Sequence, residues 1–131
     1  RVVKRGGDSI VVAGMDNDGD GRKFPQNGDV NKTLHGVSDS AFIVMLEHDP
    51  TSWRRKILPQ SKAQLTLSGH THAMQFMLGG WSPVAFVYDE WGGMYYESGR
   101  AMNVSTGVGG FIPFRFGVPG EIVVIELRIR N

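Results

Sequence analysis

The sequence predicts an α/β fold, mostly β-sheet with two or three short helices. Residues 41–46 form a continuous apolar run of strand length, which is typical of a strand buried on both faces. Asp49 and Pro50 then mark a helix start, because proline at the first helical position loses no hydrogen bond. The second half contains short strand candidates separated by turns, in keeping with 18 glycines among 131 residues.

The first half is expected to alternate strands with short helices. Residues 2–4 and 9–13 predict a hairpin around two adjacent glycines. After a polar loop, Asp29 is expected to cap a short helix, because its carboxylate can accept hydrogen bonds from the first free backbone N–H groups. The helix that begins at Pro50 carries three cations near its end, where the helix dipole favours positive charge. A further strand is expected at residues 65–67.

The second half is expected to be almost entirely β. Strands are predicted at residues 84–88, 95–98, 101–105 and 122–130. The last of these alternates regularly, so successive side chains would face opposite sides of a sheet. No internal repeat or low-complexity linker divides the chain.

The composition excludes several classes of function. The formal charge is +1 with both signs scattered along the chain, so no nucleic-acid partner is indicated. No apolar run is long enough to span a membrane. The absence of cysteine excludes disulfides and thiolate metal ligands, and it leaves the localisation open. The chain begins directly on a strand candidate without a leader segment, which predicts a piece of a longer gene product.

Three of the four histidines are predicted to meet at a metal site. His48 follows the apolar strand, and His70 and His72 follow the next strand, two residues apart. Residues two apart in an extended segment point to the same side. If the two strands are parallel neighbours, a right-handed crossover places all three imidazoles at one edge of the sheet. His35 has no such placement and is expected to lie on the surface.

Two short motifs connect this order to a known family. "LEHDP" supplies a lone histidine after a strand, and "SGHTH" supplies G-H-x-H after the next one. This order, together with residues 104–127, resembles the C-terminal half of the calcineurin-like metallophosphoesterase family, in particular a bacterial branch. The resemblance implies a four-layer α/β/β/α sandwich, of which residues 1–131 form a single partial domain without its N-terminal half. It also implies hydrolysis of phosphomonoester or phosphodiester bonds at a dinuclear metal centre.

The family's motifs D-x-H, G-D-x-x-D and G-N-H-[DE] are absent from the sequence. The resemblance implies that His48 and His70 bind one divalent ion (Mn, Fe or Zn) and His72 a second, with the remaining ligands supplied by the absent half. Three neutral imidazoles provide no anionic ligand to offset two divalent charges. The family's histidine that assists the leaving group is also missing, so this chain alone is expected to be inactive. The catalytic acid and the substrate stay unassigned.

A loop rich in aspartate matches the opening of a calcium-binding EF-hand. Asp16, Asp18 and Asp20 have the required spacing, but residue 27 is asparagine where a bidentate glutamate is needed. An ordinary acidic loop is therefore expected. The resemblance adds another interpretation, in which this loop forms part of the rim of the active site with Asp16 nearest the chemistry.

Two other functions are compatible with the same residues. One is a self-sufficient three-histidine metal protein with a cupin-like β-barrel, although Gln75 stands where a cupin needs a ligating glutamate. The other is a non-catalytic binding module with incidental histidines. Arg115 is expected to meet either a phosphate or a carboxylate. A sheet that has lost half of its domain would expose apolar faces and open edges, which predicts a homo-oligomer.

Overall fold

The computed structural model describes residues 1–19, 21 and 23–129, and these contain one mixed sheet and a few short helices. The strands are β1 (Val2–Arg5), β2 (Asp8–Gly14), β3 (Phe42–Leu46), β4 (Leu65–Ser68), β5 (Gly93–Glu97) and β6 (Arg100–Val104). The helices are α1 (Val30–Thr33), a π-helical segment (Trp53–Ile57) that runs into α2 (Leu58–Gln60), and two 3₁₀ turns (His72–Gln75 and Pro83–Phe86). The predicted α/β class is confirmed.

The sheet has the order β1-β2-β3-β4-β6-β5. Its four central strands run parallel, and each edge strand belongs to an antiparallel hairpin, β1–β2 at one edge and β5–β6 at the other. β3 pairs directly with β4, with Val44 opposite Leu65 and Leu46 opposite Leu67. The predicted parallel neighbours, joined by a helical connection, are therefore confirmed.

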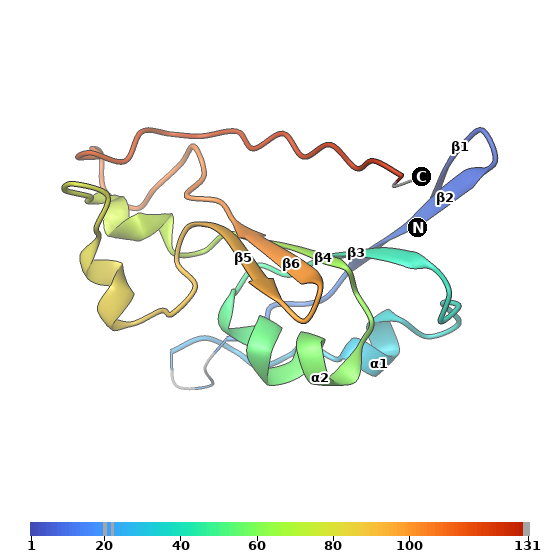
Figure 1. Ribbon diagram of the computed structural model, residues 1–131. Coiled ribbons are helices and arrows are strands. Elements are labelled where there is room, and N and C mark those ends of the chain that lie inside the picture. The colour runs from blue at the N-terminus through green and yellow to red at the C-terminus, as the bar shows by residue number, and fades with distance from the viewer. Residues whose placement is uncertain (20, 22, 130–131) are drawn as a thin grey trace.

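Both labelled helices lie on one side of the sheet, and the C-terminal segment runs past the other side (Figure 1). The core lies under the helices, where Ile43 and Met45 of β3 pack with Trp53 and Ile57 of the helical connection. The side chains of Met45, Trp53 and Ile57 are fully buried. Each such side chain contributes about 1.5–3 kcal/mol by leaving water, so this layer is the main source of stability.

Local sequence explains the short helices. Asp29 caps α1 as expected, since its carboxylate accepts a hydrogen bond from the backbone N–H of Lys32. In the connection after β3, Leu58 donates to the carbonyl of Trp53 in a π-helical turn. Pro59 follows directly and lacks an N–H, so it cannot make the ordinary bond to the residue four positions earlier. No helix in the described part of the chain has the length and apolar character needed to cross a membrane.

Two strand predictions in the second half are wrong. Residues 84–88 were expected to be extended, but Pro83–Phe86 is a 3₁₀ turn whose cap is the Ser82 side chain. Proline at its start presets a helical φ, which favours the turn over an extended strand. Residues 122–129 are not paired as a strand, since no neighbouring strand offers them a hydrogen-bond ladder, and Arg130 lies outside the described residues.

Candidate functional site

Parallel pairing brings the first two site histidines together at the carboxyl ends of β3 and β4. The N–H of Gly69 donates to the carbonyl of His48 at 3.0 Å, so the chain leaves both strands at the same level. The ring centroids of His48 and His70 are 5.1 Å apart, with the rings nearly perpendicular. A Cβ on Gly69 would lie 3.8 Å from the imidazole of His48, so the two segments are in contact.

All three predicted ligands, His48, His70 and His72, line one cavity of about 700 Å³. The other residues that line this cavity are Lys23, Phe24, Thr71, Met74, Val84, Val87, Tyr88 and Phe111. His35 lies outside the cavity on the exposed end of α1, as expected. The ends of β3 and β4, with the turn after β4, therefore bring His48, His70 and His72 together at the carboxyl ends of these two strands.

The donor set fits a metal only in part. Imidazole nitrogens suit Mn, Fe and Zn ions, and the three rings share one cavity. Within the described residues, however, no three histidine, aspartate or glutamate side chains are arranged to hold a metal ion. The cavity contributes nitrogen donors without the anionic oxygens that a divalent pair requires.

The backbone around the histidines is left-handed, not extended as the sequence suggested. His70 has φ 72°, and His72 through Gln75 have φ between 49° and 56°. None of these residues is glycine, and each left-handed residue costs about 1–2 kcal/mol. The two imidazoles therefore share a cavity because of a tight left-handed turn, and surrounding contacts must offset its strain.

Gln75 supplies the strongest of these contacts. Its side chain is 1% exposed, and its amide oxygen accepts from the backbone N–H groups of Phe111 and Ile112 at 2.9 and 3.1 Å. Its amide nitrogen donates to the carbonyls of Ile112 and Phe114 at 2.9 and 2.7 Å. A Cβ on Gly110 would lie 2.5 Å from this amide, so only glycine fits beside it. One side chain thus joins the left-handed turn to the closing loop, residues 106–118.

The closing loop also fixes the ring of His72. The Nδ1 atom of His72 lies 3.2 Å from the carbonyl of Thr106, which favours a proton on Nδ1 and leaves Nε2 as the acceptor. Arg115 donates to the same carbonyl at 2.9 Å and also to the carbonyl of Gly109. Within the described residues the guanidinium of Arg115 pairs with no carboxylate, since it bonds backbone carbonyls and lies 3.5 Å from Nδ1 of His72. The phosphate contact stays a prediction. Arg115 serves as a brace behind His72.

The ring of His70 is held by residues from other elements. Its Nε2 lies 2.9 Å from the hydroxyl of Tyr88 and 3.8 Å from a carboxylate oxygen of Asp49. The ring of Phe24 packs against it edge to face, with centroids 4.5 Å apart. These contacts fix the orientation of the His70 ring.

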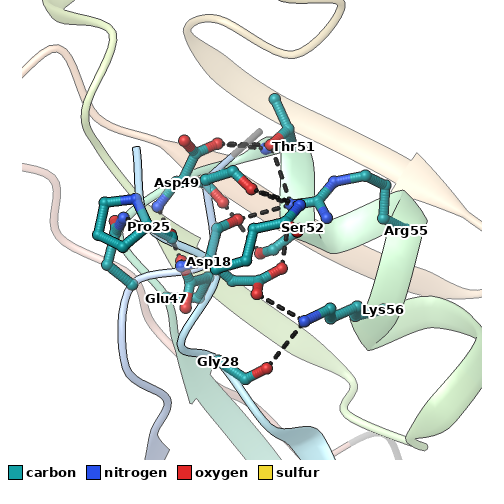
Figure 2. A network of polar contacts seen from close by, with 12 residues as sticks. Asp18, Pro25, Gly28, Glu47, Asp49, Thr51, Ser52, Arg55 and Lys56 are labelled. Atoms are coloured by element: carbon teal, nitrogen blue, oxygen red, sulfur yellow. Dashed lines mark hydrogen bonds and ion pairs between the residues drawn. The ribbon is translucent and has the colours of Figure 1, made fainter. Parts of the chain in front are cut away.

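A network of polar contacts joins the acidic loop to the end of β3 and to the helical connection (Figure 2). Asp18 is fully buried and pairs with Arg55 at 3.0 Å and with Lys56 at 2.6 Å. Lys56 also donates to the carbonyl of Gly28 at 2.9 Å. Two cations of the helical connection therefore hold the acidic loop against β3, and breaking such a buried pair typically costs about 3–5 kcal/mol.

Glu47 lies in the same network and is 2% exposed. One oxygen accepts from the N–H groups of Asp18 and Asp49 at 3.1 and 3.0 Å. The other oxygen has no hydrogen-bond partner within the described part of the chain. Burial raises the pKa of Glu47 to about 7, which outweighs the opposing effect of the two backbone hydrogen bonds. A carboxyl group that is about half protonated near pH 7 therefore precedes His48 in the chain.

Within the described residues, the acidic loop shows no group of side chains arranged to hold a calcium ion. The charge of Asp18 is already paired with two cations, and Asp16 is exposed and outside the histidine cavity, so the expectation that Asp16 lies nearest the chemistry is wrong. Asp20 lies outside the described residues. The loop does reach the rim, but through Lys23 and Phe24. The salt bridges of Asp18, which the sequence alone does not show, hold this loop in position.

Sequence reasoning missed the residues that hold the ligands in place. Gln75 was considered only as a poor substitute for a cupin glutamate, and Thr106 was not singled out. A polar amide inside an otherwise apolar stretch, followed much later by paired glycines, is the signal that was available. It could not be interpreted without knowing that residues 75 and 110 meet.

Several known proteins are similar to this chain over most of its length. The chain is 32% identical to an uncharacterised metallophosphoesterase, YkuE of Bacillus subtilis, over 95% of its own length and 43% of that protein. It is 35% identical to a transmembrane protein with a metallophosphoesterase domain of Danio rerio, over 92% of its length and 28% of that protein. An uncharacterised metallophosphoesterase of Aquifex aeolicus matches at 28% identity over 91% of the chain and 46% of that protein.

This chain belongs to the metallophosphoesterase family. The resemblance drawn from "LEHDP" and "SGHTH" is thereby confirmed. The chain spans less than half the length of these relatives. No family model matches it, and no solved structure matches it either.

Replacing Gln75 by alanine should destabilise the chain by about 3 kcal/mol, because four hydrogen bonds are lost and the left-handed turn is released. Urea unfolding followed by tryptophan fluorescence measures this change. Gln60→Ala, at an exposed position on the end of α2, is the matched control and should change the free energy of unfolding by less than about 0.5 kcal/mol. Equal losses of unfolding free energy in the two variants would show that the Gln75 side chain does not hold the left-handed turn in place.

Glu47 should make the metal-free chain less stable as pH rises. Its pKa is about 7 when folded and 4.5 as the reference for the unfolded chain, so the folded state binds the proton more tightly. Its contribution is fully present below pH 4.5 and is lost as pH rises to about 7, on the order of 3 kcal/mol. The difference in unfolding free energy between wild type and Glu47→Gln should follow this course. The same difference should stay constant below pH 4.5, and a flat curve from there to pH 7 would refute the shift.

Proposed function

We propose that this chain supplies three histidine ligands of a dinuclear centre that hydrolyses phosphomonoester or phosphodiester bonds. The observation that carries the proposal is the presence of His48, His70 and His72 on one cavity in a chain of the metallophosphoesterase family. In this proposal His48 and His70 bind one divalent ion and His72 binds the other. Mn, Fe and Zn all suit imidazole ligands.

The histidine geometry supports these roles. Nδ1 of His72 lies against the carbonyl of Thr106, so Nε2 faces away from it, and the hydroxyl of Tyr88 orients the ring of His70. Backbone and side-chain partners of this kind orient metal-bound imidazoles and fix their tautomers. Divalent ions at this edge would activate water as the nucleophile and polarise the phosphoryl oxygens. The chain's own residues orient the ligands and shape the cavity.

The fold supports a partial domain that a longer gene product completes. On the face of the sheet opposite the core, β2, β3 and β4 carry Val12, Leu46 and Leu67, which are only partly covered. A second layer on this face would produce the four-layer α/β/β/α sandwich that the family resemblance implies. The same missing layer would pair residues 122–129 as a strand and supply the anionic ligands. On this proposal the chain is inactive alone and gains activity when the rest of the domain is present.

The described sheet argues against the cupin-like alternative. It is open, with β1 and β5 at its edges, and its four central strands are parallel. A closed cupin-like barrel has neither feature. The buried amide of Gln75 is occupied by four backbone groups, so it is not a ligand substitute.

Replacing His48 or His72 by alanine in the complete gene product should lower kcat for bis(4-nitrophenyl) phosphate at least 100-fold, since each removes a ligand from one ion. Metal content measured by mass spectrometry after dialysis should fall in parallel. His35→Ala is the matched control, and both its kcat and its metal content should equal those of the wild type. Full activity and metal content in His48→Ala and His72→Ala would rule out the proposed ligands.

Metal titration of the isolated chain separates the competing functions. The proposal expects weak, substoichiometric Mn²⁺ and Zn²⁺ binding by calorimetry, because anionic ligands are lacking. Tight stoichiometric binding to the chain alone would favour a self-sufficient metal protein. Absence of metal from both the chain and the complete gene product would leave a non-catalytic binding module.

The isolated chain should form a homo-oligomer, because partly exposed apolar side chains and open strand edges favour association. Light scattering across a hundredfold concentration range should show a dimer or a larger species. Leu46→Lys, on the partly covered face of β3, should shift the distribution toward monomer, while Val124→Lys in the unpaired C-terminal segment serves as an exposed control. A monomer of unchanged mass at every concentration would contradict this proposal.

A further inference from the structure

The cavity lined by the three histidines also has a large apolar surface, which metal binding does not require. Its volume of about 700 Å³ lies in the range of pockets for whole organic ligands. Beside the imidazoles, its lining includes the apolar side chains of Phe24, Met74, Val84, Val87 and Phe111. A phosphate group alone needs polar partners and would not explain this apolar wall.

The wall is built from segments that are tied to the histidine turn. The hydroxyl of Ser82 donates to the carbonyl of Ala73, which is adjacent to His72, at 2.7 Å, and Ser82 is fully buried. At the other end of this segment, buried Glu90 pairs with Arg54 at 2.5 Å. The segment that carries Val84 and Val87 is therefore anchored at both ends. It is a fixed wall and not a loose loop.

Several wall side chains are nevertheless open to solvent. Val87 is 69% exposed and Phe111 is 76% exposed, although both line the cavity. Large apolar side chains gathered around a concave site mark a binding surface. The same cavity is also lined by the three imidazoles, so polar nitrogen atoms and this apolar wall face one space. A phosphate would meet the imidazoles, and an uncharged group would meet the wall.

The side chains of the wall restrict which kind of uncharged group can lie against it. Phe24, Met74, Val84, Val87 and Phe111 carry no hydrogen-bonding side-chain groups. The hydroxyl of Thr71 donates to the carbonyl of Trp91, and that of Tyr88 contacts His70. A sugar or a nucleobase would leave its polar groups unpaired against such a surface, which is costly. A hydrocarbon chain loses nothing there and gains from leaving water.

We propose that the substrate is a phosphoester of a long-chain alcohol or acylated alcohol. Its phosphate lies at the imidazoles, and its hydrocarbon chain lies along the wall formed by Val84, Val87, Phe111 and Met74. This inference rests on the proposed phosphoesterase function and names the substrate class of that same site. Each methylene buried on the wall should raise kcat/KM about fourfold, because transfer from water favours burial by roughly that factor.

The test uses the complete gene product loaded with Mn²⁺ and a series of alkyl 4-nitrophenyl phosphodiesters from methyl to octyl. The leaving group is constant, so the slope of log(kcat/KM) against chain length reports the wall alone. We expect a steep slope in the wild type and a shallow one in Val87→Ser and Phe111→Ser. Phe86→Ser is the matched control, because Phe86 is 84% exposed and does not line the cavity, so its slope should equal that of the wild type.

Each alternative outcome overturns the inference in a recognisable way. Hydrolysis of all esters with a flat slope would show that another layer of the domain covers the wall, and the phosphoesterase function would stand. A preference for thymidine 4-nitrophenyl phosphate over the octyl ester would assign a nucleoside substrate instead. Failure to hydrolyse any ester, together with absent metal, would remove the proposed function and the inference with it.

Discussion

The parallel pairing of β3 with β4 is the constraint on which the candidate site depends. It brings the ends of two strands to one level, where the N–H of Gly69 donates to the carbonyl of His48. The helical connection between these strands also stabilises the pairing, because its side chains Trp53 and Ile57 fill the core. Hydrophobic burial on one face of the sheet therefore fixes the positions of polar side chains at its edge.

The third histidine depends on a different kind of support. His72 begins a run of left-handed residues, which is unfavourable for side chains with a Cβ. That run persists because Gln75 satisfies four backbone groups of the closing loop and because Phe116 pairs with the turn at Gln75 and Met77. The strain and its compensation both lie beside the cavity, as is common where a site needs a fixed geometry.

The acidic residues near the site are of two kinds, which differ in whether a cation pairs with them. Asp18 is charged and paired with Arg55 and Lys56, so it stabilises the approach of the loop to the sheet. Glu47 lies close by without a cation of its own, and burial raises its pKa to about 7. The sequence shows Asp18 and Glu47 only as two acidic residues and does not distinguish these states, because the difference arises from which cations the fold brings within reach.

The sequence by itself determined the order of strand, lone histidine, helix, strand and G-H-x-H, and with it the edge at which His48 and His70 meet. These features are local or follow from the handedness of parallel crossovers, so no distant contact is needed to infer them. The hairpin at the start and the cap at Asp29 were predictable for the same reason. Only the tertiary structure decided the left-handed turn at His72, the roles of Gln75 and Arg115, and the helical state of Pro83–Phe86. Those depend on hydrogen bonds between residues far apart in the chain, such as the 39 positions from Gln75 to Phe114, and no local pattern encodes such a meeting.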